Sequence, residues 1–176
     1  MKIDIARQPL VPAFMTLFAL AVAAMCAGIP VSDTSGAVRD ALPLLGGQLA
    51  RFQAAYPVWS KFAAGFMLLF TGMCAGRITI RYNLYTVGTC LPIPLYAIVA
   101  CGIATGGNYL AGFAASMLLS LATKNYCRAF CNGYGFDAIF RASLYLGLMP
   151  LIYAPGLPML LLLPLVELLL KKKHLS

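Results

Sequence analysis

The sequence contains few ionisable side chains for its length. Charged residues make up 10% of its 176 positions, and only five residues are acidic, whereas about a quarter of the residues in a soluble domain are charged. The one histidine, His174, lies in the C-terminal tail. The shortage of charge excludes an ordinary soluble domain. Because the one histidine lies in the tail, the sequence offers no Ser–His–Asp set for nucleophilic catalysis.

Long uncharged stretches take the place of the missing charge. Hydrophobic residues make up 61% of the chain, and a membrane-spanning helix needs about 20 consecutive apolar residues. We therefore predict an all-α, polytopic integral membrane protein with about five to six membrane segments in one domain, 1–176. The expected segments are spans at about 10–29, 58–76, 84–104 and 109–123, followed by a hairpin at 142–170. Cleavage of the first segment as a signal peptide after Ala24 is the alternative for that segment.

The last uncharged stretch, 142–170, contains four prolines and one charged residue, Glu167. As one straight helix its 29 residues would extend about 43 Å, beyond a hydrocarbon core of about 30 Å, yet two full spans need about 40 residues. We predict a short, proline-broken helical hairpin that is packed against other helices at its hinge. Gly156 is expected to take a positive φ at the reversal. The predicted hinge residues are Pro150, Pro155, Gly156 and Pro158.

Two further segments carry helix-breaking residues. Apolar residues recur at near-helical spacing over 38–53, but Pro43 and the Gly46–Gly47 pair interrupt the pattern. This segment is either a short helix in the membrane interface or a polar loop. Pro92 and Pro94 lie inside the expected 84–104 span and should kink it.

The basic residues lie between the apolar runs, which predicts topology rather than nucleic-acid binding. The formal net charge is +8, and Lys and Arg mark cytoplasmic loops. With the hairpin, ten basic residues fall on the cytoplasmic side and three (Arg39, Arg51 and Lys61) outside, whereas a single crossing would divide them seven to six. We therefore expect a multi-pass protein of the bacterial inner membrane with both termini in the cytoplasm. The basic residues expected to set topology are Arg77, Arg81, Lys124, Arg128, Arg141, Lys171, Lys172 and Lys173.

The sequence offers little chemistry for a cofactor or a metal ion. Four of its six cysteines lie in expected spans, and Cys127 and Cys131 form an i, i+4 pair without the further ligands that a metal site needs. Glu167 can pair with Lys171, one helical turn later. We expect no cofactor, no metal and reduced cysteines.

Two stretches resemble a known family. Residues 76–104 read GRITIRYNLYTVGTCLPIPLYAIVACGIA and residues 136–171 read FDAIFRASLYLGLMPLIYAPGLPMLLLLPLVELLLK. The second resembles the hairpin, and the first the Arg-Tyr-Asn…Leu-Pro…Leu-Tyr segment, of a family of polytopic inner-membrane proteins of unknown function from Bacteroidetes. The resemblance implies that this chain corresponds to the N-terminal part of a longer family member. The run 146–150 departs from that family by interrupting a segment that is expected to continue.

The same hairpin pattern is similar to one in membrane glycosyltransferases that use lipid-linked sugars. Those enzymes carry an acidic residue in the first external loop, where this chain has Asp33 and Asp40. The resemblance makes these two the candidate catalytic residues. The interpretation that we favour is that Asp33 begins a turn and Asp40 is solvated.

The sequence therefore favours a non-enzymatic inner-membrane subunit or helper in an envelope process. Its expected partners are membrane lipids and other membrane proteins, without nucleic acid. The alternatives are an accessory or remnant of a lipid-linked-sugar glycosyltransferase and a small membrane transporter subunit.

Overall fold

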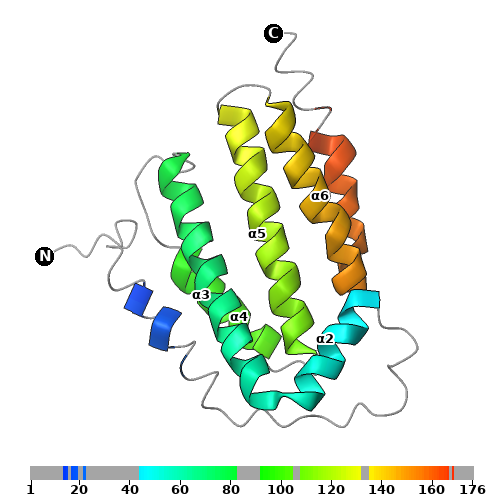
Figure 1. The fold of residues 1–176 in the computed structure, drawn as a ribbon. Coiled ribbons are helices and arrows are strands. Elements are labelled where there is room, and N and C mark those ends of the chain that lie inside the picture. Colours follow the sequence, from blue (N-terminus) through cyan, green and yellow to red (C-terminus); the bar gives the residue numbers. More distant parts are fainter. Residues whose placement is uncertain are drawn as a thin grey trace, which may run out of the picture.

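The computed structural model describes residues 44–82, 92–104, 108–131 and 135–166, together with 168 and several positions between 14 and 22. The protein is all-α, as predicted, and its described part contains no strand. Figure 1 shows the elements in order. They are α2 (Leu44–Ala55), α3 (Pro57–Arg81), α4 (Pro92–Ala104), α5 (Tyr109–Cys131), α6 (Phe136–Ile152) and the 3₁₀ helix η2 (Ala154–Leu161), which continues as helix to Val166.

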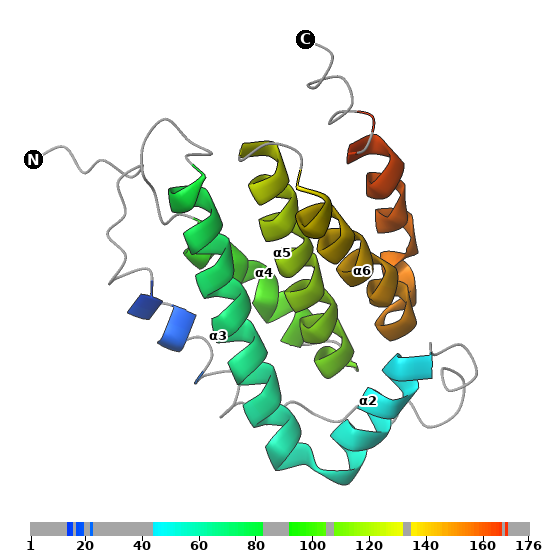
Figure 2. The ribbon, with the colours of Figure 1, turned by 45° about the horizontal axis from the view of Figure 1, so that its top comes forward.

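The helices α3 to α6 form a bundle, and α2 lies across one end of it (Figures 1 and 2). Helix α5 is central and packs against both α3 and α6, while α4 packs on α3 and α5. One end of the bundle, where α2 meets the start of α3, we call the aromatic end. The other, where α3 and α5 finish and α6 starts, we call the cationic end.

Helix α3 is longer than the expected 58–76 span. It begins with Pro57, whose fixed φ suits the first helical position, and it continues through Arg77 to Arg81. It approaches α4 closely at Gly76, where an added Cβ would lie 2.6 Å from Ile93 Cδ1. Glycine at this position therefore lets the two backbones pack together.

The proline kink expected inside the 84–104 span is not tested, because the described part of this helix, α4, begins at Pro92. Pro92 is its first residue and Pro94 follows within the first turn. At the start of a helix the missing N–H of proline would have no intrahelical partner anyway, so neither ring has to bend the helix. Residues 84–91 of the expected span lie outside the described residues.

Helix α5 begins at Tyr109, as expected, but continues beyond Thr123 through the basic segment to Cys131. Helix α2 runs through Gly46 and Gly47, so these glycines do not interrupt it. Gly46 is buried, and α2 packs against α3, α5 and α6, so tertiary contacts stabilise a helix that intrinsic propensity disfavours.

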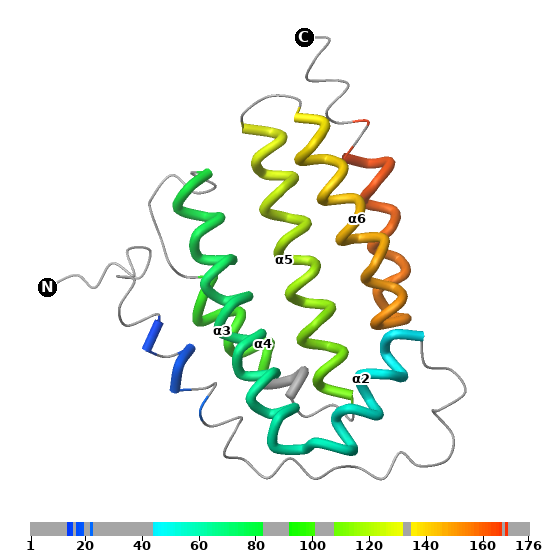
Figure 3. Tube along the Cα trace, viewed as in Figure 1, coloured from blue at the N-terminus to red at the C-terminus, as the bar shows by residue number. Residues whose placement is uncertain are grey.

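The chain reverses direction after α6. Tyr153 is extended (φ −139°, ψ 101°), and the following segment runs back beside α6 toward the cationic end, as the tube in Figure 3 shows. The Gly156 N–H donates to the Tyr153 carbonyl at 2.9 Å, so a local 3₁₀ bond satisfies the interrupted backbone. Pro150 lies inside α6 and Pro158 inside η2.

Two details of the hinge differ from expectation. Gly156 lies in the 3₁₀ helix without a left-handed φ, so the positive φ expected there is wrong. What Gly156 provides is space, because a Cβ there would lie 3.1 Å from two atoms of Met149. Gly156 is buried, but Pro155 is exposed, so only part of the hinge is packed against protein.

The N-terminal span expected at 10–29 is described at only a few positions. Residues 14, 15, 17–19 and 22 are helical. Leu17 is fully buried in the core cluster shared by α3, α4 and α5, and its side chain lies against Gly72.

The bundle exposes many large apolar side chains, and its buried residues include many small ones beside large ones such as Phe113 and Leu146. On α3 the buried face includes Ala64, Gly65 and Gly72, while Phe62 and Phe66 are 61% and 68% exposed. Helices α4, α6 and η2 also expose large apolar side chains. Exposed apolar residues there include Leu95, Ile98, Val99, Phe136, Phe140, Leu144, Leu157, Leu161 and Leu165.

Candidate functional site

A basic pocket of about 390 Å³ lies at the cationic end, between α3, α5 and α6. Four cationic side chains line it: Arg81, Lys124, Arg128 and Arg141. The three helix ends that carry them lie together at the top of Figures 1 and 2. The pocket therefore depends on residues up to 60 positions apart in the chain.

Each cation is positioned by a different local feature. Arg81 is the last residue of α3. Lys124 and Arg128 are one turn apart on α5, so they share a face of that helix. Arg141 lies near the beginning of α6, after the short connection from α5.

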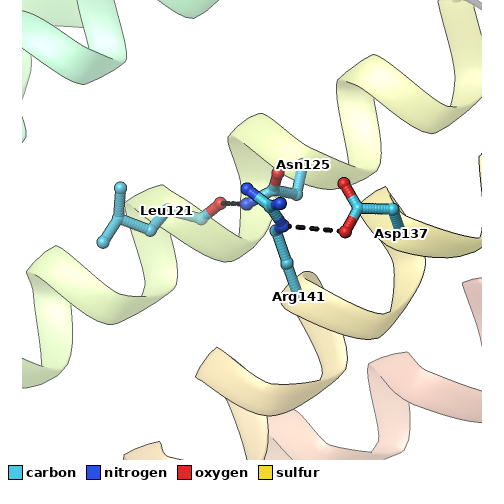
Figure 4. A network of polar contacts seen from close by, with 4 residues as sticks. All are labelled: Leu121, Asn125, Asp137 and Arg141. Atoms are coloured by element: carbon cyan, nitrogen blue, oxygen red, sulfur yellow. Dashed lines mark hydrogen bonds and ion pairs between the residues drawn. The ribbon is translucent and has the colours of Figure 1, made fainter.

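Among the described residues, Arg141 is the cation of this pocket that has a carboxylate partner. Its Nε donates to Asp137 Oδ1 at 3.0 Å, one turn earlier on α6 (Figure 4). Both side chains are more than half exposed, so this ion pair contributes at most about 1 kcal/mol to stability. Asp137 is the sole carboxylate whose side chain the structure describes.

The neutral side chains of the pocket are also hydrogen-bonding groups. Tyr82, Asn125 and Tyr145 line it beside the cations. Asn125 Nδ2 donates to the Leu121 carbonyl at 2.9 Å (Figure 4). Cations, phenols and an amide can bind an anion, but this lining has no free carboxylate or imidazole to act as a general base.

Two tyrosine–serine contacts join the helices of the bundle away from the pocket. Ser60 Oγ of α3 donates to the Pro57 carbonyl at 2.8 Å and lies 2.6 Å from Tyr109 Oη of α5. Because a serine hydroxyl has one hydrogen, Tyr109 is the donor in the second contact. The arrangement recurs between α4 and α5, where Ser116 Oγ donates to the Phe113 carbonyl at 2.9 Å and lies 3.1 Å from Tyr96 Oη.

A glutamine from α2 contacts the start of α5. Gln53 is buried, and its Oε1 accepts a hydrogen bond from the Leu110 N–H at 3.4 Å. The first N–H groups of a helix lack intrahelical acceptors. Gln53 thus caps α5 from another helix and ties α2 to the bundle.

The two cysteines near the pocket differ in environment. Cys127 is half-buried and Cys131 is exposed, and neither forms a disulfide with another described residue. Burial raises the pKa of the Cys127 thiol, and the neighbouring Cys131 adds to this effect. Among the described residues, no group of three or more His, Cys, Asp or Glu side chains could hold a metal ion.

Several residues singled out from the sequence lie outside the described residues. These are Asp33, Asp40, Glu167 and the lysines 171–173. Arg77 is exposed at the cationic end, one turn before Arg81, but it does not line the pocket.

Sequence reasoning identified the four cations of the pocket as markers of topology but did not bring them together. The i, i+4 spacing of Lys124 and Arg128 indicated one shared face. Their convergence with Arg81 and Arg141 depends on how α3 and α6 pack on α5. Tyr82 and Tyr145 were not predicted as site residues, although Tyr82 belongs to the Arg-Tyr-Asn segment of the resemblance.

The resemblances noted in the sequence have no support from comparison with known proteins. No family model, curated protein or solved structure matches this chain.

Proposed function

We propose that this chain is a polytopic protein of the bacterial inner membrane that acts as a non-enzymatic subunit or helper in an envelope process. Its bundle is embedded in the bilayer with the cationic end toward the cytoplasm. Both termini are on that side, and the α6–η2 hairpin enters the membrane and returns.

The observation that carries this proposal is the distribution of side chains on α3. Its outward residues include Phe62, Phe66 and Phe70, whereas Ser60 and Thr71 are buried. A soluble bundle buries its large apolar residues, because burying apolar surface drives its folding. In lipid that driving force between helices is missing, so helices associate through small and hydroxyl residues. The α3 helix follows the second pattern.

The two ends of the bundle support the orientation. Phe52, Tyr56, Trp59 and Phe62 line a shallow groove at the aromatic end, and aromatic rings favour the headgroup layer. The opposite end holds Arg77 and the four cations of the basic pocket. The excess of positive charge there is typical of a cytoplasmic surface.

Helix lengths set how much of the bundle crosses the bilayer. Among the described helices, α3 alone is both long and apolar enough to span by composition, and only 39% of its most apolar stretch is buried. At 1.5 Å per residue α3 is about 37 Å long and α5 about 34 Å, enough for a core of about 30 Å. Helix α6 has 17 residues, about 25 Å, which suits one arm of a hairpin that does not cross.

Extraction tests membrane embedding directly. We expect the chain to sediment with membranes after alkaline carbonate treatment and to require detergent for release. Release by carbonate into the supernatant would reject the proposal.

A reporter fused after Ser176 tests the orientation. A cytoplasm-active reporter should work at this position, and a reporter that works only in the periplasm should be silent. The opposite result would reject the returning hairpin. As a second measurement, a membrane-impermeant maleimide should reach the exposed Cys131 only after the cells are opened.

The helper role is tested by capture in mild detergent followed by identification of the bound proteins and lipids. Recovery of a defined envelope protein in constant ratio to the chain supports it. A chain that purifies alone and turns over a lipid-linked sugar would instead favour the transferase alternative.

A further inference from the structure

The basic pocket holds more positive charge than the fold requires. Cations in the last turn of a helix are stabilised by the partial negative charge of its final carbonyls. Arg81 and Arg128 occupy such positions on α3 and α5. Lys124 lies seven residues before the end of α5, beyond the last turn where this effect acts, and Arg141 lies near the positive start of α6. The helix dipoles therefore do not account for Lys124 and Arg141.

Membrane topology does not account for the pocket either. The positive-inside rule requires only that basic residues lie on the cytoplasmic side of the membrane, not that they converge around one cavity. Arg77 satisfies that bias from the same helix as Arg81 without lining the pocket. Convergence instead raises the electrostatic repulsion among Arg81, Lys124, Arg128 and Arg141.

This repulsion is not balanced by carboxylates in the described part of the protein. Asp137 is the one acidic side chain described there, and its Oδ1 accepts from Arg141. The chain as a whole has five acidic residues against thirteen basic ones. A ligand with negative charge would therefore relieve the repulsion that the protein leaves in place.

The donor set of the pocket suits a phosphate group. Guanidinium groups bind phosphate through paired N–H donors, and an ammonium adds a compact charge. Tyr82 and Tyr145 add phenolic hydroxyls that can donate to the remaining oxygens. Basic pockets between membrane helices on the cytoplasmic side bind anionic lipid headgroups, and a volume of about 390 Å³ exceeds what one phosphate needs.

We propose that the pocket formed by Arg81, Lys124, Arg128 and Arg141 binds a phosphate group. This group is either the phosphodiester of an anionic lipid headgroup or a free phosphate in the cytoplasm. The lipid form rests on the proposed membrane orientation, which places the pocket at headgroup level, whereas the free form does not.

Binding is tested with two probes on the full-length chain. In the first arm, the chain is placed in nanodiscs of phosphatidylcholine with a minor share of phosphatidylglycerol, and the lipids that stay bound are counted by native mass spectrometry. In the second arm, inorganic phosphate is titrated against the detergent-solubilised chain, and the shift in Tm is compared with that produced by chloride at equal ionic strength.

The variants separate a pocket from general surface charge. Arg81→Gln and Lys124→Gln each remove one pocket cation, and Arg77→Gln removes a cation from the same end outside the pocket. Each pocket variant should weaken binding of the effective probe by about tenfold, the usual effect of losing one charged hydrogen bond. Arg77→Gln should bind like the unmodified chain.

The outcomes identify the source of the phosphate. Selective retention of phosphatidylglycerol that only the pocket variants lose supports the lipid headgroup, and a phosphate-dependent Tm shift that only they lose supports the free anion. Equal weakening by Arg77→Gln, or no binding of either probe, overturns the proposal. Carbonate extraction of the same preparations reports on membrane embedding independently. If the chain stays in the membrane but shows no pocket-dependent binding, phosphate binding is rejected and membrane embedding is retained.

Discussion

Two serine residues accept hydrogen bonds from tyrosines of neighbouring helices in this bundle. Ser60 and Ser116 each donate to a carbonyl three residues earlier in their own helix, which leaves the hydroxyl oxygen to accept from a tyrosine on a neighbouring helix. The two contacts join α3 to α5 and α4 to α5. In an apolar environment such bonds matter because a buried phenol that lost its acceptor could not turn to water.

Replacing Ser60 by Ala should destabilise the bundle. The substitution removes the acceptor of the buried Tyr109 hydroxyl, at a cost of about 1 kcal/mol. Thermal unfolding in detergent measures the effect, with Tyr109→Phe and the double variant completing a double-mutant cycle. The double variant should lose less than the sum of the two single losses, and strict additivity would show that the bond contributes nothing.

Cys127 should react more slowly with maleimide than Cys131 at neutral pH. Cys127 is less exposed, and its raised pKa lowers the fraction of reactive thiolate. Variants that keep Cys127 or Cys131 as the one cysteine of the chain, with the other five replaced by serine, separate the rates. Removing Cys131 eliminates the smaller cause of the raised pKa of Cys127 and leaves burial, the larger cause. The reaction rate of Cys127 with maleimide should therefore still increase with pH above the range in which an unperturbed thiol is fully ionised. Equal rates and equal pH profiles would contradict this environment.

At the level of elements, local sequence determines where the α6–η2 hairpin breaks, and packing determines the direction of its returning segment. Pro155 has no N–H and disfavours α-helical geometry at Ala154, where the chain enters the 3₁₀ helix η2, so a break of the α-helix near this position is favoured locally. The direction of the returning segment depends on Gly156, which lies against Met149 of α6. Contacts among Ala142, Leu146 and Val166 then close the hairpin.

Replacing Gly156 by Leu should open the hairpin or destabilise it by about 1–3 kcal/mol, because the new side chain would overlap Met149. Gly147→Leu on α6 is the matched control, since a Cβ at Gly147 meets no atom within 4 Å. Met149→Ala should partly rescue the Gly156 variant. Yield after detergent extraction and Tm measure all three, and equal damage from both glycine variants would show that space at the hinge is not the cause.

At the scale of the whole molecule, the bundle has an apolar circumference, an aromatic end and a cationic end. Exposed leucine and phenylalanine side chains surround α4, α6 and η2. A soluble monomer seldom exposes apolar surface of this extent. This distribution fits a protein surrounded by lipid, with the pocket at the headgroup layer of one leaflet.

Trp59 should report this placement. It is the one tryptophan of the chain and is 69% exposed at the aromatic end. Lipids brominated near the headgroup should quench its fluorescence more than lipids brominated at the chain ends, because indole rings favour the interface. Unchanged Trp59 emission with either lipid, together with strong quenching by aqueous acrylamide, would place the aromatic end in water.

The sequence by itself determined the fold class and the approximate position of most helices. Charge-free stretches separated by arginine, lysine and paired glycines predict helices from local properties, because helix formation depends on neighbours three and four positions apart. For the same reason the i, i+4 relation of Cys127 and Cys131 was predictable. Helix ends were less so, since α3 and α5 extend into charged segments that hydropathy treats as loops.

Only the tertiary structure decided how distant residues meet. Gly46 and Gly47 form part of a helix because α2 packs on the bundle, and Gly156 is required for its contact with Met149 rather than for its φ. The basic pocket is the clearest case, since its cations come from the end of α3, the second half of α5 and the start of α6. Their convergence is set by the packing of three helices, which the local periodicity of a single sequence does not encode.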